Sequence, residues 1–362
     1  MKVVVVSGIW PPDVGGPASH APELADFLHE RGHSVHVVTT ADAAPARRPY
    51  AVDWAPRRYP PGVRHCFTAG LVHRAARQAE VVYSTGMLGR SVLGAAGAPL
   101  VVRLAGDPAY ERALRRGWTR APLDRFQAQG GAAIAALRRL RDLELRRAAR
   151  IVVPSQALAE IVRGWGFEAE VVPHAVSAPA VPEASSDGRT LVFAGRLVPQ
   201  KALSVAFEAV RRNERVTLLV AGDGPERARI EAEAPSNVRL LGAQPRERVF
   251  ELLRSADATL LSSDWESFGL VAAESLALGT PVLAAAAGGV AEVVENERNG
   301  LLVPAGDAAG LAEAIRRYFA DPELRARLRA AAADSVRDLA PDLVYPRYER
   351  ILEEVARSSG AS

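Results

Sequence analysis

Residues Lys2–Trp10 read KVVVVSGIW, a short run of β-branched residues that breaks at the turn-rich loop PPDVGGPASH of Pro11–His20. A helical pattern then runs through Leu24 and Leu28, and a second expected strand, HSVHVVTT of His33–Thr40, follows at once. A strand, a helix and a second strand in this order are typical of a parallel sheet covered by helices on its faces. The N-terminus therefore predicts an α/β fold.

The same alternation continues through both halves of the chain. Further short apolar runs, separated by helical patterns, are EVVYSTG, PLVVRLAG and RIVVPS in the first half and TLVFAGR, VTLLVAGDG, VRLLGA, ATLLSS, TPVLAAA and GLLVPAG in the second. Between the halves, residues 176–188 read VSAPAVPEASSDG, which is typical of a linker. We therefore predict two Rossmann-like, doubly wound domains at 1–175 and 176–342, facing one another across a cleft.

At 362 residues the chain is long enough for two domains of about 150 to 200 residues, and its 48% apolar content is typical of a compact globular protein. A single cysteine, Cys66, excludes an internal disulfide and a cysteine-rich zinc site. No segment reaches the roughly 18 consecutive apolar residues of a membrane span, and the N-terminus lacks the layout of a signal peptide. These features predict a cytoplasmic protein.

Positive charge is concentrated between Glu111 and Arg150, where eleven arginines face four acidic residues. This basic window, Arg112–Arg150, fits either a solvated helix face or a peripheral contact with an anionic membrane surface, which would lie at the inner membrane face. The window has few aromatic residues that stack on bases, so we predict no nucleic-acid partner.

Gly15 and Gly16 in the first loop allow the backbone to approach a ligand, and the helix behind them offers amide groups to an anion. The loop is not a GxGxxG dinucleotide fingerprint, because Pro17, Ala18 and Ser19 follow the two glycines. On its own, this pattern fits a plain turn as well as an anion-binding loop.

The segment GRLVPQKA, residues 195–202, places two cations at the end of an expected strand. Gly195 and Arg196 end the strand, and Lys201 opens the helix that follows. Two cations five residues apart across a tight loop favour a diphosphate held from two sides, with ordinary surface cations as the alternative.

The stretch DWESFGLVAAES, residues 264–275, carries carboxylates at Glu266 and Glu274. We expect the preceding strand to end near Ser263 and a helix to start at 267–269, so Glu266 lies in the loop and Glu274 lies about one turn further along the helix face. The amides expected to point at an anion belong to Phe268, Gly269 and Leu270. Glu266 is predicted to bind sugar hydroxyls and Glu274 a ribose diol. Asp264 beside Glu266 offers a metal-binding pair, but Arg196 and Lys201 already supply positive charge, so we predict no metal.

Together, GRLVPQKA, SSDWESFGLVAAESLALGTPV and GGVAEVVENERNGLLVPAGD resemble the retaining nucleotide-sugar glycosyltransferases of family four. The resemblance covers nearly the whole chain and implies a GT-B fold, with the acceptor mainly on the first domain, the donor mainly in the second, and a last helix at about 343–362 packed back on the first. It implies metal-independent transfer of a hexosyl group, with retention and a front-face mechanism, from a UDP- or GDP-sugar to a hydroxyl of a small-molecule, glycan or lipid acceptor. No cofactor is implied.

By this resemblance, Arg196, Lys201 and Glu266 are the catalytic residues, with both cations stabilising the leaving diphosphate. The donor-binding residues are Gly15, Gly16, Gly195, Gly222, Gly242, Ser267, Phe268, Gly269, Leu270 and Glu274.

Two positions depart from the family pattern. Ala105 stands where many relatives carry a histidine, so Arg103 and Asp107, the nearest polar side chains, become candidates for sugar or acceptor contacts together with His20. The segment often ending Pro-Asn-Gly-Val reads PHAV at 173–176. Alternative functions are a catalytically weak nucleotide-sugar-binding protein of the same fold and a nicotinamide-dependent oxidoreductase, which the missing GxGxxG disfavours.

Overall fold

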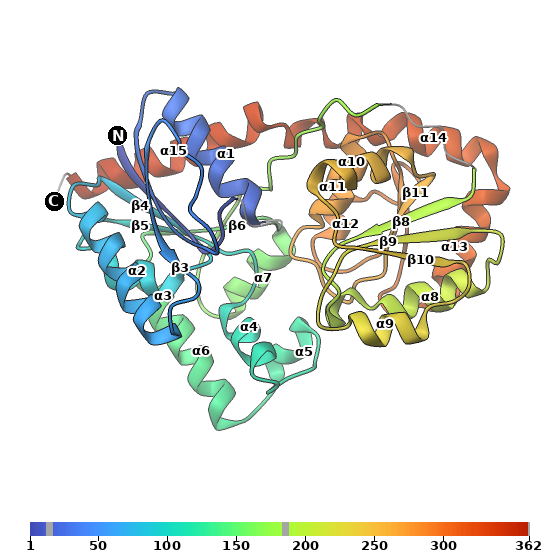
Figure 1. The fold of residues 1–362 in the computed structure, drawn as a ribbon, viewed down its shortest axis with the longest axis horizontal. Helices are drawn as coiled ribbons and strands as arrows, with labels where there is room; N and C mark the ends of the chain where they lie inside the picture. The colour runs from blue at the N-terminus through green and yellow to red at the C-terminus, as the bar shows by residue number, and fades with distance from the viewer. Residues whose placement is uncertain (12–16, 183–187, 361–362) are drawn as a thin grey trace. The chain divides into compact units, whose positions relative to one another are not determined.

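The computed structural model describes residues 1–11, 17–182 and 188–360, and the chain divides into two compact units (Figure 1). The first unit comprises Met1–Ala175 together with Asp342–Ser362, and the second comprises Val176–Pro341. Each unit is built on one parallel sheet with helices on both faces.

The seven strands of the first unit are hydrogen-bonded in the order β3-β2-β1-β4-β5-β6-β7. They are β1 (Lys2–Ser7), β2 (Ser34–Ala41), β3 (Ala51–Pro56), β4 (Val81–Thr85), β5 (Leu100–Arg103), β6 (Arg150–Val153) and β7 (Glu170–Val171). The helices are α1 (Pro17–Glu30), α2 (Pro61–Ala76), α3 (Leu88–Gly94), α4 (Pro108–Arg115), α5 (Leu123–Ala128), α6 (Ala132–Leu145), α7 (Gln156–Gly164) and α15 (Pro341–Gly360). The strand order reverses between β1 and β4, which defines a topological switch point.

Strand β1 lies in the middle of the first core and is buried on both faces. Val3 and Val5 pack into the cluster that α1 and α15 cover, whereas Val4 and Val6 pack into the cluster that α2 and α7 cover. Two covered faces leave no position for a polar side chain, which explains the uninterrupted valine run of the sequence.

The last helix, α15, is attached to the first unit by polar as well as apolar contacts. The Tyr345 hydroxyl donates to Glu23 on α1 at 2.7 Å, and the Tyr348 hydroxyl donates to the Val172 carbonyl at 3.3 Å. Both tyrosines are buried, at 3% and 0% exposure, so α15 forms part of the first core.

The second sheet has the order β10-β9-β8-β11-β12-β13 and reverses between β8 and β11. Its strands are β8 (Thr190–Ala194), β9 (Thr217–Ala221), β10 (Val238–Gly242), β11 (Ala258–Leu261), β12 (Val282–Ala285) and β13 (Gly300–Val303). Its helices are the 3₁₀ turn η1 (Pro199–Lys201), α8 (Leu203–Arg211), α9 (Arg227–Glu233), α10 (Arg246–Ser255), α11 (Leu270–Ala277), α12 (Val290–Val293), α13 (Ala308–Ala320), α14 (Pro322–Ala332) and η2 (Asp334–Leu339). The segments GRLVPQKA and DWESFGLVAAES follow β8 and β11, so both lie at the carboxyl ends of the two strands that flank the switch point.

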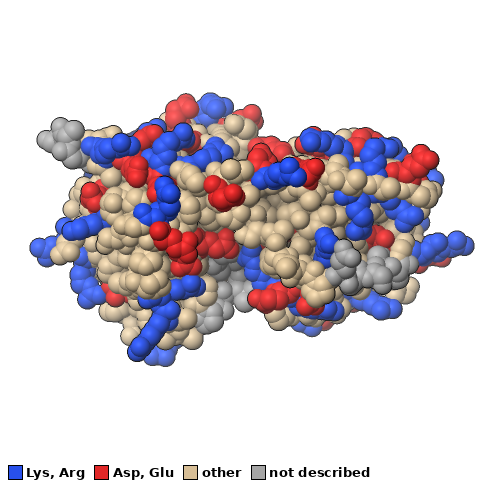
Figure 2. Space-filling model, turned by 90° about the horizontal axis from the view of Figure 1, so that it is seen from above, with Lys and Arg blue, Asp and Glu red and all other residues tan. Residues whose placement is uncertain are grey.

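Acidic and basic side chains are interspersed over the face shown in Figure 2. Many belong to pairs within one helix, such as Arg350–Glu354 at 3.8 Å and Arg357–Glu353 at 3.9 Å on α15. Exposed pairs of this kind contribute little to stability. Within the described residues, none of the helices combines the length and the apolar character needed to cross a bilayer.

Glycines end three neighbouring strands of the second sheet. The Gly195 amide donates to the Ala221 carbonyl at 3.0 Å, and the Gly222 amide donates to the Gly242 carbonyl at 2.8 Å. A Cβ atom added to Gly222 would lie 1.8 Å from the Gly195 carbonyl oxygen. The chain can pass this point only without a side chain at residue 222.

We therefore expect Gly222→Ala to lower the free energy of unfolding by about 2 to 4 kcal/mol, because the backbone must move to remove the overlap. The control is Gly70→Ala on α2, where an added Cβ would meet nothing within 4 Å and a small stabilisation is expected. Urea unfolding followed by circular dichroism measures both variants. Equal stability of Gly222→Ala and the wild type would contradict the prediction.

Candidate active site

The loops after β8 and β11 are joined to each other by backbone and side-chain contacts. The Asp264 amide donates to the Gln200 carbonyl at 2.9 Å, and the Ser262 hydroxyl donates to the Lys201 carbonyl at 2.9 Å. These contacts place the η1 turn beside the loop that carries Glu266. Residues 65 positions apart in sequence thereby share one site.

Lys201 and Glu266 form an ion pair at this junction, with side chains 19% and 16% exposed. The Ser263 hydroxyl also donates to Glu266 Oε1, at 2.7 Å. Both charged groups are thus held in place by protein contacts and remain within reach of solvent. The ammonium is positioned to donate to an anion, and the carboxylate to accept from hydroxyl groups.

Arg196 lies in the same loop as Lys201, but its side chain is exposed and makes no ion pair with any residue that the structure describes. The structure therefore joins two of the three predicted catalytic residues directly and leaves Arg196 at the surface next to them. An unpaired guanidinium beside a strand end can still close on an anion as it binds.

Helix α11 starts at Leu270, slightly later than the expected 267–269, because Gly269 has a left-handed conformation with φ 88°. The first helical hydrogen bond runs from the Ala273 amide to the Gly269 carbonyl at 3.1 Å, so the Leu270, Val271 and Ala272 amides precede the hydrogen bonds of the helix. Phe268 is 4% exposed and packs into the core, while Ser267 is partly exposed. The predicted anion-binding amides therefore lie at a true helix N-terminus, anchored by a buried phenylalanine.

Two further glycines support this loop, and no role was predicted for them. The Gly289 amide donates to the Glu266 carbonyl at 2.8 Å. A Cβ on Gly288 would lie 2.3 Å from that carbonyl oxygen, and a Cβ on Gly289 would lie 2.7 Å from the Phe268 Cα. A Gly-Gly pair that follows the end of β12 after two intervening residues is a signal for such close approach.

Glu274 lies within α11 and is 8% exposed. Arg246, the first residue of α10, donates to Glu274 Oε1 at 3.1 Å, and its guanidinium stacks over the Phe250 ring at 5.0 Å. Glu266 and Glu274 therefore have different cationic partners, Lys201 and Arg246. The sequence did not identify Arg246, because 28 residues separate it from Glu274.

In the first unit, His20 and Arg103 lie in one buried polar cluster beneath α15. Arg103 Nε donates to the Tyr348 hydroxyl at 2.9 Å, and its NH2 group contacts His174 Nε2 at 2.9 Å. His20 Nε2 contacts the Tyr83 hydroxyl at 2.6 Å. Arg103 is 2% exposed and His20 is 3% exposed, so neither side chain lines an open surface in this structure.

Asp107, the other predicted sugar contact, is fully buried and is separate from that cluster. Its carboxylate accepts from the Ala109 amide at 2.8 Å as the N-cap of α4, from Gln127 at 3.1 Å and from Arg141 at 3.1 Å. These three contacts give Asp107 a structural role in holding α5 and α6. Gly15 and Gly16 lie outside the described residues.

Within the described part of the chain, His33, Glu349 and Glu353 are the residues grouped closely enough to hold a metal ion. Glu349 already contacts His33 at 2.7 Å and Arg31 at 3.3 Å. A metal ion would have to compete with the Arg31 guanidinium for the same carboxylate oxygen.

Burial lowers the pKa of His20 and of His174 well below the usual value for histidine, and the Arg103 charge lowers each pKa further. Both imidazoles are therefore neutral in the folded protein at neutral pH. Protonation would place a second positive charge beside a buried guanidinium.

The unfolded chain binds more protons than the folded chain once the pH falls below the ordinary histidine pKa of about 6.5. We expect the free energy of unfolding to fall below this pH by up to about 1.4 kcal/mol per pH unit for each of these histidines. Urea unfolding at about pH 7.5 and about pH 5.5 measures the effect, which His20→Gln should reduce. The exposed His65→Gln should keep the wild-type dependence. The same pH dependence in wild type and His20→Gln would contradict the assignment.

The sequence matches known families along most of its length. Residues 14–178 match the family described as Glycosyltransferase Family 4, and residues 178–335 match the family described as Glycosyl transferases group 1. A D-inositol 3-phosphate glycosyltransferase of Saccharomonospora viridis is 31% identical over 89% of this chain and 85% of its own length. The lipopolysaccharide core biosynthesis glycosyltransferase LpsD of Rhizobium meliloti is 34% identical over 51% of this chain, and the match spans 57% of that relative.

Solved structures share the architecture of both units. Sucrose-phosphate synthase from Thermosynechococcus elongatus matches with a TM-score of 0.79 at 20% identity, over 99% of both chains. HepE of Anabaena, solved in complex with UDP-glucose, matches with a TM-score of 0.76 at 18% identity, over 98% of this chain and 100% of that one. Two parallel-sheet α/β domains of this kind define the GT-B fold. The chain belongs to the glycosyltransferases of family four.

Proposed function

We propose that the protein is a retaining glycosyltransferase that moves a hexosyl group from a UDP- or GDP-sugar to an acceptor hydroxyl. The observation that carries the proposal is the Lys201–Glu266 pair at the carboxyl ends of β8 and β11, which flank the switch point of the second sheet. Ligands of doubly wound sheets bind at such points. The complex of HepE with UDP-glucose supports a nucleotide sugar as donor.

In this mechanism, Lys201 and Arg196 neutralise the charge that develops on the leaving diphosphate, together with the amides at the start of α11. Glu266 accepts hydrogen bonds from hydroxyls of the transferred sugar, and Glu274 accepts from the ribose. The anomeric carbon loses its bond to the diphosphate oxygen and gains one to the acceptor oxygen on the same face. The departing phosphate takes the acceptor proton, so the site needs neither a protein nucleophile nor a metal.

The matched variants are Lys201→Ala and Glu266→Ala, with Arg212→Ala and Glu208→Ala as controls from an exposed ion pair of the same unit. We expect the first two to lower kcat by about 10²- to 10³-fold, because each removes transition-state stabilisation, and the controls to retain wild-type rates. The assay measures nucleotide released from UDP-, GDP-, ADP- and dTDP-sugars with EDTA present. Circular dichroism verifies folding.

Wild-type turnover in folded Lys201→Ala would refute the site, and activity that EDTA abolishes and manganese restores would refute the metal-free mechanism. A catalytically weak binding protein of the same fold is the alternative function. That alternative predicts that the wild-type chain binds a nucleotide sugar but releases no nucleotide with any acceptor tested.

We further propose that the acceptor is lipid-linked and that the first unit contacts an anionic membrane at the cytoplasmic side through its basic window. Helix α6 buries Ile134 and Leu137 and exposes Leu140 and Leu143, at 45% and 59%. Exposed arginines of the window lie among these leucines, at Arg139, Arg146 and Arg147. A basic, apolar helix face of this kind favours binding in a lipid interface.

Vesicles with about 30% anionic phospholipid should sediment the protein at about 50 mM salt and release most of it at about 300 mM, because salt screens the arginine charges. Leu143→Glu should abolish sedimentation, whereas Leu343→Glu, at a leucine 53% exposed on α15, should not. Absence of sedimentation at low salt, or equal loss in both variants, would overturn the membrane contact.

A further inference from the structure

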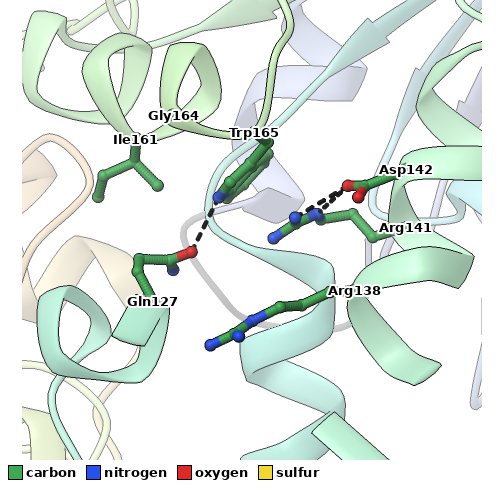
Figure 3. A pocket seen from close by; sticks show the side chains of 7 residues that line it. All are labelled: Gln127, Arg138, Arg141, Asp142, Ile161, Gly164 and Trp165. Atoms are coloured by element: carbon green, nitrogen blue, oxygen red, sulfur yellow. Dashed lines mark hydrogen bonds and ion pairs between the residues drawn. The ribbon is translucent and has the colours of Figure 1, made fainter. Parts of the chain in front are cut away.

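The first unit contains a pocket of about 340 Å³ whose lining includes none of the residues assigned above to the donor. It is open to solvent and is lined by residues of α5, α6 and the end of α7 (Figure 3). Its lining residues are Gln127, Arg138, Arg141, Asp142, Ile161, Gly164 and Trp165. The volume lies at the small end of the range for ligand pockets, which suits a single ring with a substituent.

One wall of the pocket is rigid and largely apolar. The Trp165 indole is covered on one face by the Arg141 guanidinium, whose Cζ lies 3.7 Å from the ring centroid. The indole Nε1 donates to Gln127 Oε1 at 2.9 Å, so the ring is fixed from two directions. Ile161 adds aliphatic surface beside it. Such a wall can take the apolar face of a small ring.

The Arg141 charge is already neutralised. Arg141 is 3% exposed at its side chain and lies between two carboxylates, Asp107 at 3.1 Å and Asp142 at 2.8 Å. Asp107 also binds Gln127, so this buried carboxylate holds two lining residues of the pocket in place. Arg141 is thus fully engaged by carboxylates and offers no free donor charge to a ligand.

Arg138, in contrast, makes no ion pair with any carboxylate of the described residues. Its guanidinium stacks over the Phe126 ring at 4.9 Å and donates to the Phe126 carbonyl, while its buried Nε has no hydrogen-bond partner. Burial, followed by the nearby Arg141 charge, lowers its pKa. Figure 3 shows the guanidinium reaching into the pocket below Gln127. The pocket thus contains one guanidinium that forms no ion pair with a carboxylate of the described residues, while Asp107 and Asp142 act on it from a longer distance.

We propose that this pocket is a second ligand site, for a carboxylate or phosphate carried on a small ring such as a sugar acid or a sugar phosphate. Arg138 binds the anionic group, and the Trp165–Ile161 wall packs against the ring. The site shares no residue with the Lys201–Glu266 pair and does not depend on glycosyl transfer.

The test is isothermal titration calorimetry with three probes: glucuronate, glucose 6-phosphate and neutral glucose. At least one of the two acids should bind at least tenfold more tightly than glucose, because a hydrogen bond to a charged partner adds to the ring contacts. The acid that binds more tightly shows whether the site prefers a carboxylate or a phosphate. None of the probes contains a nucleotide, and the Lys201→Ala variant distinguishes binding in this pocket from binding at the donor site.

Arg138→Gln should weaken binding of that acid at least tenfold, and Arg138→Lys should restore most of it, which a purely structural role of the arginine would not produce. Arg139→Gln, an exposed neighbour on the same helix, and Lys201→Ala should each change the affinity less than twofold. Thermal melting verifies that each variant is folded. No binding of either acid up to about 10 mM, equal affinity for glucose, or equal loss in Arg139→Gln would overturn the proposal.

Discussion

The candidate active site depends on the close approach of two strand ends in the second sheet. The Gly195 carbonyl lies so near the Gly222 Cα that a methyl group has no room there. On the other side of β8, the turn that follows this strand is held to the loop that follows β11 by the Asp264–Gln200 and Ser262–Lys201 hydrogen bonds. The Lys201–Glu266 pair forms across the same junction. Gly288 and Gly289 also allow a close backbone approach, because they lie against the backbone of Glu266 and Phe268.

The electrostatics of the two units differ in a way that bears on ligand binding. In the second unit, both carboxylates of the candidate site have a cationic partner, Lys201 for Glu266 and Arg246 for Glu274. A partly buried charge is costly without a partner, and the groups of such a pair can exchange partners when a ligand enters. In the first unit, Arg103 and Arg138 contact aromatic, imidazole or carbonyl groups in place of carboxylates. For Arg103, the neutral His174 imidazole and the Tyr348 hydroxyl solvate the buried charge; for Arg138, the open side of the guanidinium faces a pocket.

Local pattern was sufficient for the fold class and for the placement of the main motifs. Short apolar runs and intervening helical periods predicted parallel sheets, and the GT-B fold is confirmed. The expected start of α11 differed slightly because Gly269 adopts a left-handed conformation before the helix begins. In the first half of the chain, the sequence did not indicate which buried partners the polar residues have. Asp107 follows β5 as expected, but it caps α4 and pairs with Arg141, a contact across 34 residues that no local pattern encodes.

The chain composition and its periodicity alone were enough to establish the two-part α/β architecture, because burial on both faces of a parallel sheet demands uninterrupted apolar strands. The motif residues around Lys201, Glu266 and Glu274 were also visible, since each follows a strand in a recognisable order. Tertiary structure alone decided which charges meet: Lys201 with Glu266, Arg246 with Glu274, and Arg103 with His174 and Tyr348. The physical reason is that electrostatic and hydrogen-bond partners are set by distance in the folded chain, and these partners are separated by 28 to 245 residues in sequence.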